Sequence, residues 1–336
     1  MFLAEISRFP SLFPFRVPKK QTLSDKFDLE SSSFDSALLC RLRALDPPSI
    51  SLDWLSRAVD FLSFVHSEAR ILISNLNLPD LDDSLACYLN DSVKILDLCN
   101  SISSEIERLR HRRLVLNLVI HLLTSSDSDK TGPFPAPEKL KKARDSLSDW
   151  GNCSPGFKNR GFLGNLEVLV RDLAAALDKA PPRGKISGVG RLVRRTILAV
   201  GYLTVFFAGV LVSEIYGKPE LVAVRVPAEF LWADSFNKLK STISGELKRR
   251  FDSETKKGVF CVEEVEDVVI RARETCDVID DEESADKLND VVKGLEKGTL
   301  AFSCGLDRFS NAVDGMFNTV LCSRKVMLEN VRVASK

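Results

Sequence analysis

The sequence contains few of the residues that build catalytic or metal centres. Its 336 residues include three histidines, His66, His111 and His121, none in an H-E-x-x-H motif or at a zinc-ligand spacing from cysteine. It also lacks a G-x-S-x-G nucleophile elbow and a G-x-x-x-x-G-K-[ST] phosphate loop. We therefore predict no catalytic, cofactor-binding or metal-ligating residue and a protein that is not an enzyme. The alternative is an unrecognised active site inside the fold.

Cysteine pairs and net charge are also absent. None of the eight cysteines forms a C-x-x-C pair, and most fall in apolar helical patterns, so we interpret them as small core residues in a reducing compartment. Lys plus Arg and Asp plus Glu both number 47, so we expect no overall attraction to nucleic acid. The basic run RLRHRR at 108–113 is interpreted as a solvent-facing helix surface paired with Glu105 and Glu107, with phosphate or acidic lipid as the alternative partner.

The sequence shows no alternating strand pattern and no repeat of fixed length. The fold class predicted is therefore all-α, an elongated bundle of long, mostly antiparallel helices. The expected helices cover residues 31–45, 49–76, 81–123, 138–150, 162–180, 193–216, 227–251, 259–280 and 284–331. The glycine-containing stretch 184–190 is interpreted as a linker, because it lacks the third glycine of a dinucleotide-binding fingerprint.

Two of these helices carry heptad-like stripes that predict lengthwise packing. The first stripe consists of Tyr88, Ser92, Ile95, Cys99, Ile102, Ile106 and Leu109. The second consists of Leu288, Val291, Leu295, Gly298, Phe302, Gly305, Phe309, Val313, Met316, Val320, Ser323 and Met327. Glycine is a poor helix former, so we expect a kink between Gly298 and Gly305.

The chain divides into an N-terminal tail, residues 1–30, and a helical domain, residues 31–336, with a flexible break at about 124–161. The first 22 residues carry four basic residues against one acidic residue, Glu5, as an organelle transit peptide does. Three prolines in this stretch would interrupt an amphipathic helix, which favours a disordered tail. No secretory signal is visible, so we expect an intracellular protein in the cytoplasm, at a membrane or in both.

One helix, expected over 193–216, is far more hydrophobic than the rest. Thr196–Ser213 contains eighteen residues without a charge, or about 27 Å of helix, slightly less than the roughly 30 Å of a bilayer core. A membrane-spanning helix would place the two striped helices on opposite sides of the membrane. A helix that is apolar on every face also suits the centre of a bundle. Both interpretations stay open: a buried core helix, or a single membrane span.

Several segments resemble the plant BYPASS family. These are SFDSALLCRLRAL (33–45), SLDWLSRAVDFLSFVHSEARILI (51–73), YLNDSVKILDLCNSISSEIERL (88–109), the closing FNTVLCSRKVMLENVRV (317–333), and FPF at 13–15. The resemblance covers nearly the whole chain.

The resemblance implies a non-enzymatic regulator of plant development that acts through protein–protein contacts. Proteins of this family restrain a root-derived mobile signal that arrests shoot and leaf growth, and some naming within the family places it in chloroplasts. No catalytic motif of the family carries over to residues here. The resemblance implies protein partners without identifying them, and the alternative function is a membrane-anchored adaptor that uses residues 196–213 as its span.

Overall fold

The computed structural model describes residues 23–46, 49–76, 83–124, 135–152, 160–177, 188–216, 224–251, 262–281 and 284–334. Within these ranges the regular structure consists of helices, as the predicted all-α class requires. Their bounds are α1 Leu23–Arg43, α2 Leu52–Ser74, α3 Asp83–Thr124, α4 Pro137–Asn152, α5 Arg160–Leu177, α6 Gly188–Tyr216, α7 Ala233–Phe251, α8 Glu263–Asp280 and α9 Ala285–Ala334.

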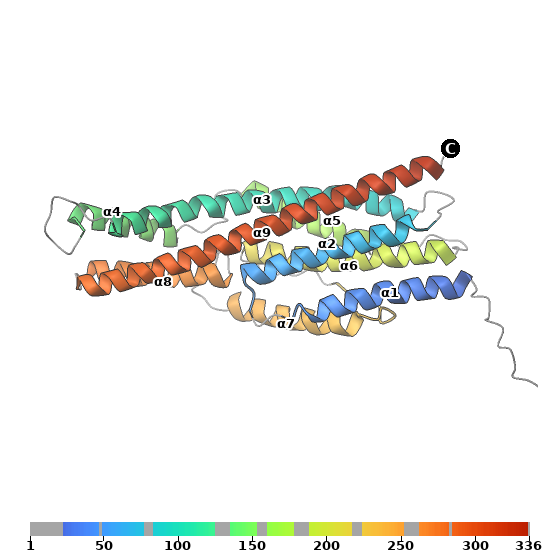
Figure 1. Cartoon of the computed structure of the whole chain (residues 1–336), viewed down its shortest axis with the longest axis horizontal. Coiled ribbons are helices and arrows are strands. Elements are labelled where there is room, and N and C mark those ends of the chain that lie inside the picture. Colours follow the sequence, from blue (N-terminus) through green and yellow to red (C-terminus); the bar gives the residue numbers. More distant parts are fainter. Residues whose placement is uncertain are drawn as a thin grey trace, which may run out of the picture.

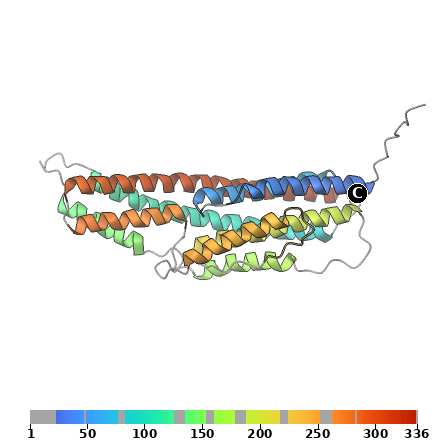
Figure 2. The same ribbon diagram turned by 90° about the horizontal axis from the view of Figure 1, so that it is seen from below.

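The two striped helices form the long axis of an elongated bundle (Figures 1 and 2). α9 has 50 residues and α3 has 42, and they pack against each other along their length. Their direction is antiparallel, because Arg110 in the second half of α3 pairs with Asp307, whereas Ser92 near its start accepts a hydrogen bond from Arg324. α4 and α8 lie at one end of this pair, and α1, α2, α5, α6 and α7 lie toward the other.

The predicted stripes are the surfaces along which these helices pack. Every member of the α3 stripe is buried, and every member of the α9 stripe is buried except the half-buried Val291. α9 runs through both glycines of its stripe, Gly298 and Gly305, as one helix. A Cβ at Gly305 would lie 2.9 Å from Leu52 Cδ1, and a Cβ at Gly298 would lie 2.9 Å from Arg271 Cδ. These glycines therefore allow α2 and α8 to approach α9 closely.

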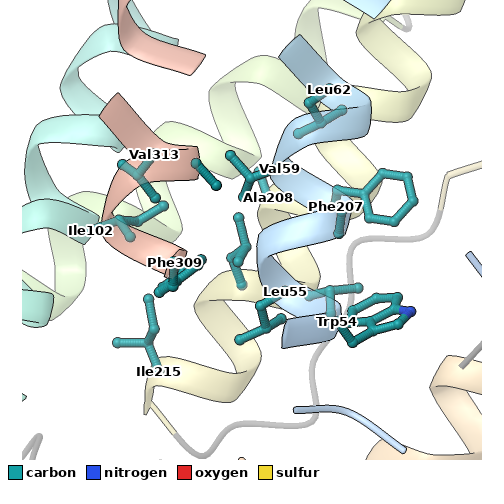
Figure 3. Packing of buried hydrophobic residues seen from close by; sticks show 14 of the residues in the cluster. Trp54, Leu55, Val59, Leu62, Ile102, Phe207, Ala208, Ile215, Phe309 and Val313 are labelled. Carbon is teal, nitrogen blue, oxygen red and sulfur yellow. The ribbon is translucent and has the colours of Figure 1, made fainter. Parts of the chain in front are cut away.

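The most apolar helix, α6, lies within the bundle. It packs against α1, α2, α3 and α5, and all residues from Leu203 to Ile215 are buried. The ring of Phe207 contacts Phe61 and Trp54 of α2, with centroids 5.7 Å and 6.3 Å away. Figure 3 shows Phe207, Ala208 and Ile215 gathered with apolar side chains of α2, α3 and α9.

Within the described ranges, α6 is the helix that meets the length and hydropathy of a membrane span. Its most apolar 18-residue window lies within Gly188–Ile215 and has a mean hydropathy of 2.1. Of that window, 78% is buried inside the bundle. A span exposes most of its surface to lipid, so this degree of burial is typical of a core helix.

Several predicted boundaries need correction. α1 begins at Leu23 rather than Ser31, and α6 begins at Gly188, so the end of the predicted 184–190 linker is helical. α7 begins at Ala233 rather than Pro227, because residues 228–232 form turns. The predicted break at 124–161 contains α4, as expected, but residues 125–134 and 153–159 lie outside the described ranges, as do residues 1–22 of the predicted tail.

The start of α2 is a junction where several helices meet. Ser51 accepts a hydrogen bond from Trp54 N as the N-cap, and the Glu264 carboxylate accepts from Leu52 N at 2.9 Å. The Arg250 guanidinium of α7 donates to the Ile50 carbonyl at 3.1 Å. The positive end of the α2 dipole is thus neutralised by an acidic residue of α8, which fixes α8 against α2.

Candidate functional site

A buried polar chain links three helices near the middle of α6. His66 of α2 is fully buried, and its Nδ1 lies 3.0 Å from Tyr88 Oη of α3 while its Nε2 lies 3.1 Å from Thr204 Oγ1 of α6. Burial lowers the pKa of His66 to about 4 and raises the pKa of Tyr88. The imidazole is therefore neutral near pH 7, and both of its nitrogens are occupied.

A cavity of about 270 Å³ lies between α3, α5 and α6, with Tyr88 and Thr204 in its wall. Apolar side chains make up most of the rest of the wall: Ile95, Leu173, Ala176, Leu177, Ile197, Leu198, Val200 and Val205. Gly201 also lines it, and a Cβ there would lie 2.5 Å from Leu177 Cδ2. The absence of a side chain at Gly201 therefore lets α5 close against α6.

The remaining lining groups are Ser84, Cys87, Asp91 and Arg194. Asp91 pairs with Lys94 at 2.9 Å. Arg194 makes no hydrogen bond or ion pair within the described part of the chain. No imidazole lines the cavity beside Cys87 or Ser84, because His66 lies behind Tyr88 and Thr204. A nucleophile activated by an adjacent base is thus not assembled here, and the geometry suits ligand binding.

A second buried polar group is Glu214, near the end of α6. Its side chain is fully buried, and neither carboxylate oxygen has a hydrogen-bond partner among the described residues. Burial is the main cause that raises the pKa of Glu214 to about 8; the positive charge of Arg250 opposes it, and the negative charges of Glu266 and Glu246 add to it. Glu214 is therefore mostly protonated at pH 7 and sits in the core as a neutral acid.

Arg195, which directly precedes the uncharged run 196–213, also makes contacts inside the bundle. Arg195 of α6 pairs with the buried Asp35 of α1 at 2.5 Å, and its guanidinium lies 4.3 Å from the centre of the Phe230 ring. Asp35 accepts a further hydrogen bond from Trp232 Nε1 at 3.3 Å. An arginine that the sequence places beside a potential membrane span thus joins α1, α6 and the turns before α7.

The basic run at 108–113 is only partly a solvated surface. Arg108 pairs with Glu105 at 2.8 Å and Arg110 with Glu107 at 2.5 Å, as predicted. The interpretation is wrong for the next two arginines. Arg112 donates to the Trp150 carbonyl at 2.7 Å and lies over the Trp150 ring, and Arg113 donates to Ser303 Oγ. These two residues hold α3 to α4 and α9.

The cysteines differ from the sequence interpretation. Of the six that the structure describes, Cys99 is buried and Cys276 half-buried, whereas Cys40, Cys87, Cys304 and Cys322 are exposed. Within the described ranges, no three His, Cys, Asp or Glu side chains are placed to hold a metal ion. His111 and His121 lie on the exposed surface of α3, away from His66.

Comparison with known proteins identifies related plant sequences. A family model described as "Protein ROH1-like" matches residues 19–150. "Protein BPS1, chloroplastic" of Arabidopsis thaliana is 29% identical over 334 residues, which cover 95% of this chain and 90% of that protein. The chain is thus similar to the plant BYPASS family along nearly its whole length. The resemblance that the sequence segments indicate is therefore confirmed.

Other similar plant proteins carry different names. "UPF0496 protein 4" of Oryza sativa subsp. japonica is 34% identical over 307 residues, covering 88% of this chain and 65% of the rice protein. "Protein ROH1D" of Arabidopsis thaliana is 24% identical over 329 residues. The chain thus spans 65% of the length of the rice relative, and none of these names is that of an enzyme. No solved structure matches the chain.

Proposed function

We propose that this protein is a non-enzymatic regulator of plant development that works through protein–protein contacts. The observation that carries the proposal is the similarity to BPS1 along nearly the full length of both chains. The BYPASS resemblance implies restraint of a root-derived mobile signal that arrests shoot growth. The described lining of the cavity contains no activated nucleophile, which supports a role without catalysis.

The two long helices offer surface for such contacts. Leu114 and Leu118 lie one turn apart on α3 and are 55% and 43% exposed, and Leu300 of α9 is 64% exposed. Large apolar side chains on a rigid surface are the groups that protein interfaces bury at their centres. Residues 31–336 act in this proposal as one domain, because α3 and α9 extend into both ends of the bundle.

We also propose that α6 remains in the bundle core rather than anchoring the protein in a membrane. The burial of Glu214 and the Arg195–Asp35 pair support this, because both groups that flank the uncharged run are engaged in packing. A span would require α6 to leave its contacts with α1, α2, α3 and α5 and would expose their apolar surfaces.

Reciprocal grafting tests the regulatory function. Roots of a plant in which the gene is disrupted are expected to arrest wild-type shoots, whereas the same shoots on wild-type roots grow normally. Expression of the intact chain in the mutant roots should restore growth. Normal growth of wild-type shoots on mutant roots contradicts the proposal.

A surface variant tests the contact mechanism in the same plants. The double substitution Leu114→Glu and Leu118→Glu should leave the helical fold intact by circular dichroism and fail to restore shoot growth. Ile270→Glu on α8 changes a residue of similar exposure, 54%, and should restore growth. Full restoration by the double variant would show that this surface is not a contact site.

A further inference from the structure

We propose that the cavity between α3, α5 and α6 binds a small organic carboxylate with an apolar body, and that Arg194 pairs with its carboxylate. This inference goes beyond the regulatory role proposed above and does not depend on it. It rests on three features of the cavity: its size, its preformed wall and the one unpaired charge among its described lining residues.

The size of the cavity limits the ligand. Its volume is about 270 Å³. An apolar protein cavity of about 150 Å³ holds benzene, with its six carbon atoms. By proportion, this cavity holds about ten to twelve non-hydrogen atoms, which is the size of a medium-chain or arylalkyl acid.

The wall of the cavity is held in place by contacts outside it. Tyr88 and Thr204 are both fixed from behind by the two nitrogens of His66, at 3.0 Å and 3.1 Å. In the same wall, the lack of a side chain at Gly201 lets Leu177 of α5 pack onto α6. Preformed apolar pockets bind ligands with less ordering cost than flexible ones, so this wall suits an apolar body.

The charges at the cavity select the polar end of the ligand. Asp91 and Arg194 are its two charged lining residues within the described ranges. Asp91 is already paired with Lys94 at 2.9 Å, whereas Arg194 has no ion-pair partner there. A guanidinium donates two parallel hydrogen bonds to a carboxylate, so an anionic ligand gains a contact that a neutral one of the same shape lacks.

Cys87 reports on occupancy because it is exposed and lines the cavity. The full chain is treated with iodoacetamide in the presence of octanoate or of octanamide, two probes of the same size. Mass spectrometry then measures the alkylation rate of each cysteine. Octanoate should slow alkylation of Cys87 at least about fivefold, with half-protection between about 10 µM and 1 mM, the range expected for a ligand of this size. Cys304 on α9 is exposed outside the cavity, and its rate should not change.

Three variants separate the charge from the cavity. Arg194→Gln should raise the octanoate concentration for half-protection about five- to tenfold and leave octanamide unchanged. Arg194→Lys keeps the charge and should keep most of the preference for octanoate. Ala176→Phe should fill the cavity and abolish protection by both probes, with the helical fold verified by circular dichroism.

Four results would overturn the proposal. The first is that neither probe protects Cys87. The second is that octanoate and octanamide protect Cys87 equally, and the third is that Arg194→Gln leaves octanoate protection unchanged. The fourth is that Cys304 is slowed as much as Cys87, which would mean nonspecific binding.

Discussion

The neutral carboxyl of Glu214 gives the stability of the protein a specific pH dependence. Its pKa is about 8 in the folded protein, against an ordinary value of 4.5. A carboxyl whose pKa is raised by folding stabilises the folded state below its unfolded pKa, and that stability is lost as pH rises toward the folded pKa. Folding near neutral pH therefore takes up a proton at this residue.

The magnitude follows from the two pKa values. Each pH unit between 4.5 and about 8 lowers the free energy of unfolding by about 1.4 kcal/mol, so the accumulated loss by pH 8 is roughly 3 to 5 kcal/mol. Glu214→Gln keeps the shape of the neutral carboxyl and removes its ionisation. The variant should therefore be close to the wild type in stability at pH 5 and more stable by several kcal/mol at pH 8.

Urea unfolding of both proteins at pH 5, 6, 7 and 8 measures this difference. Other titrating groups, including His66, contribute equally to the two proteins and cancel. The substitution Glu296→Gln, at an exposed position of α9, controls for the loss of one negative charge. A stability difference between wild type and Glu214→Gln that stays constant from pH 5 to pH 8 would refute the buried, unpaired carboxyl.

Other substitutions test the contacts that hold the bundle together. Gly305→Ala should lower the free energy of unfolding by about 1 to 3 kcal/mol, because the new Cβ would collide with Leu52. Gly315→Ala should raise it by about 0.5 to 1 kcal/mol, because no atom lies within 4 Å of the new Cβ; thermal melts compare the two variants. Asp35→Ala should lower the free energy of unfolding in urea by about 3 kcal/mol, because Arg195 and Trp232 lose their acceptor. Asp46→Ala removes only an exposed ion pair with Lys238 and should lower it by less than about 1 kcal/mol. Burial lowers the pKa of His66 to about 4, so the neutral imidazole contributes stability above pH 6.5 that is lost as the pH falls toward 4. His66→Gln should reduce this loss of stability at low pH in the same urea unfolding measurements.

The helical architecture could be predicted because its signals are local. The stripe from Tyr88 to Leu109 and the stripe along α9 are repeated at heptad spacing, and the packing of one long helix on another buries both. The ends of the helices are harder to predict than the helices themselves. The local pattern of residues 228–232 predicts helix, but these residues form turns. In this conformation Trp232 donates a hydrogen bond to Asp35 of α1, a contact that is distant in sequence.

The polar groups of the core could not be predicted in the same way. Sequence spacing pairs Arg108 with Glu105, one turn away, but it cannot bring Arg113 to Ser303 or His66 to Thr204. The cavity is likewise built from segments near residues 84–95, 173–177 and 194–205, which only the folded bundle brings together. The exposure of cysteines such as Cys304 could not be predicted, because they lie beside an apolar stripe without belonging to it.

Alkaline carbonate extraction of plant membranes tests whether α6 lies buried in the bundle. The intact chain is expressed in plant cells, and its distribution between supernatant and membrane pellet is measured after extraction. A bundle with α6 as its core is expected in the supernatant. Retention of the chain in the pellet together with an integral membrane marker would contradict the burial of α6.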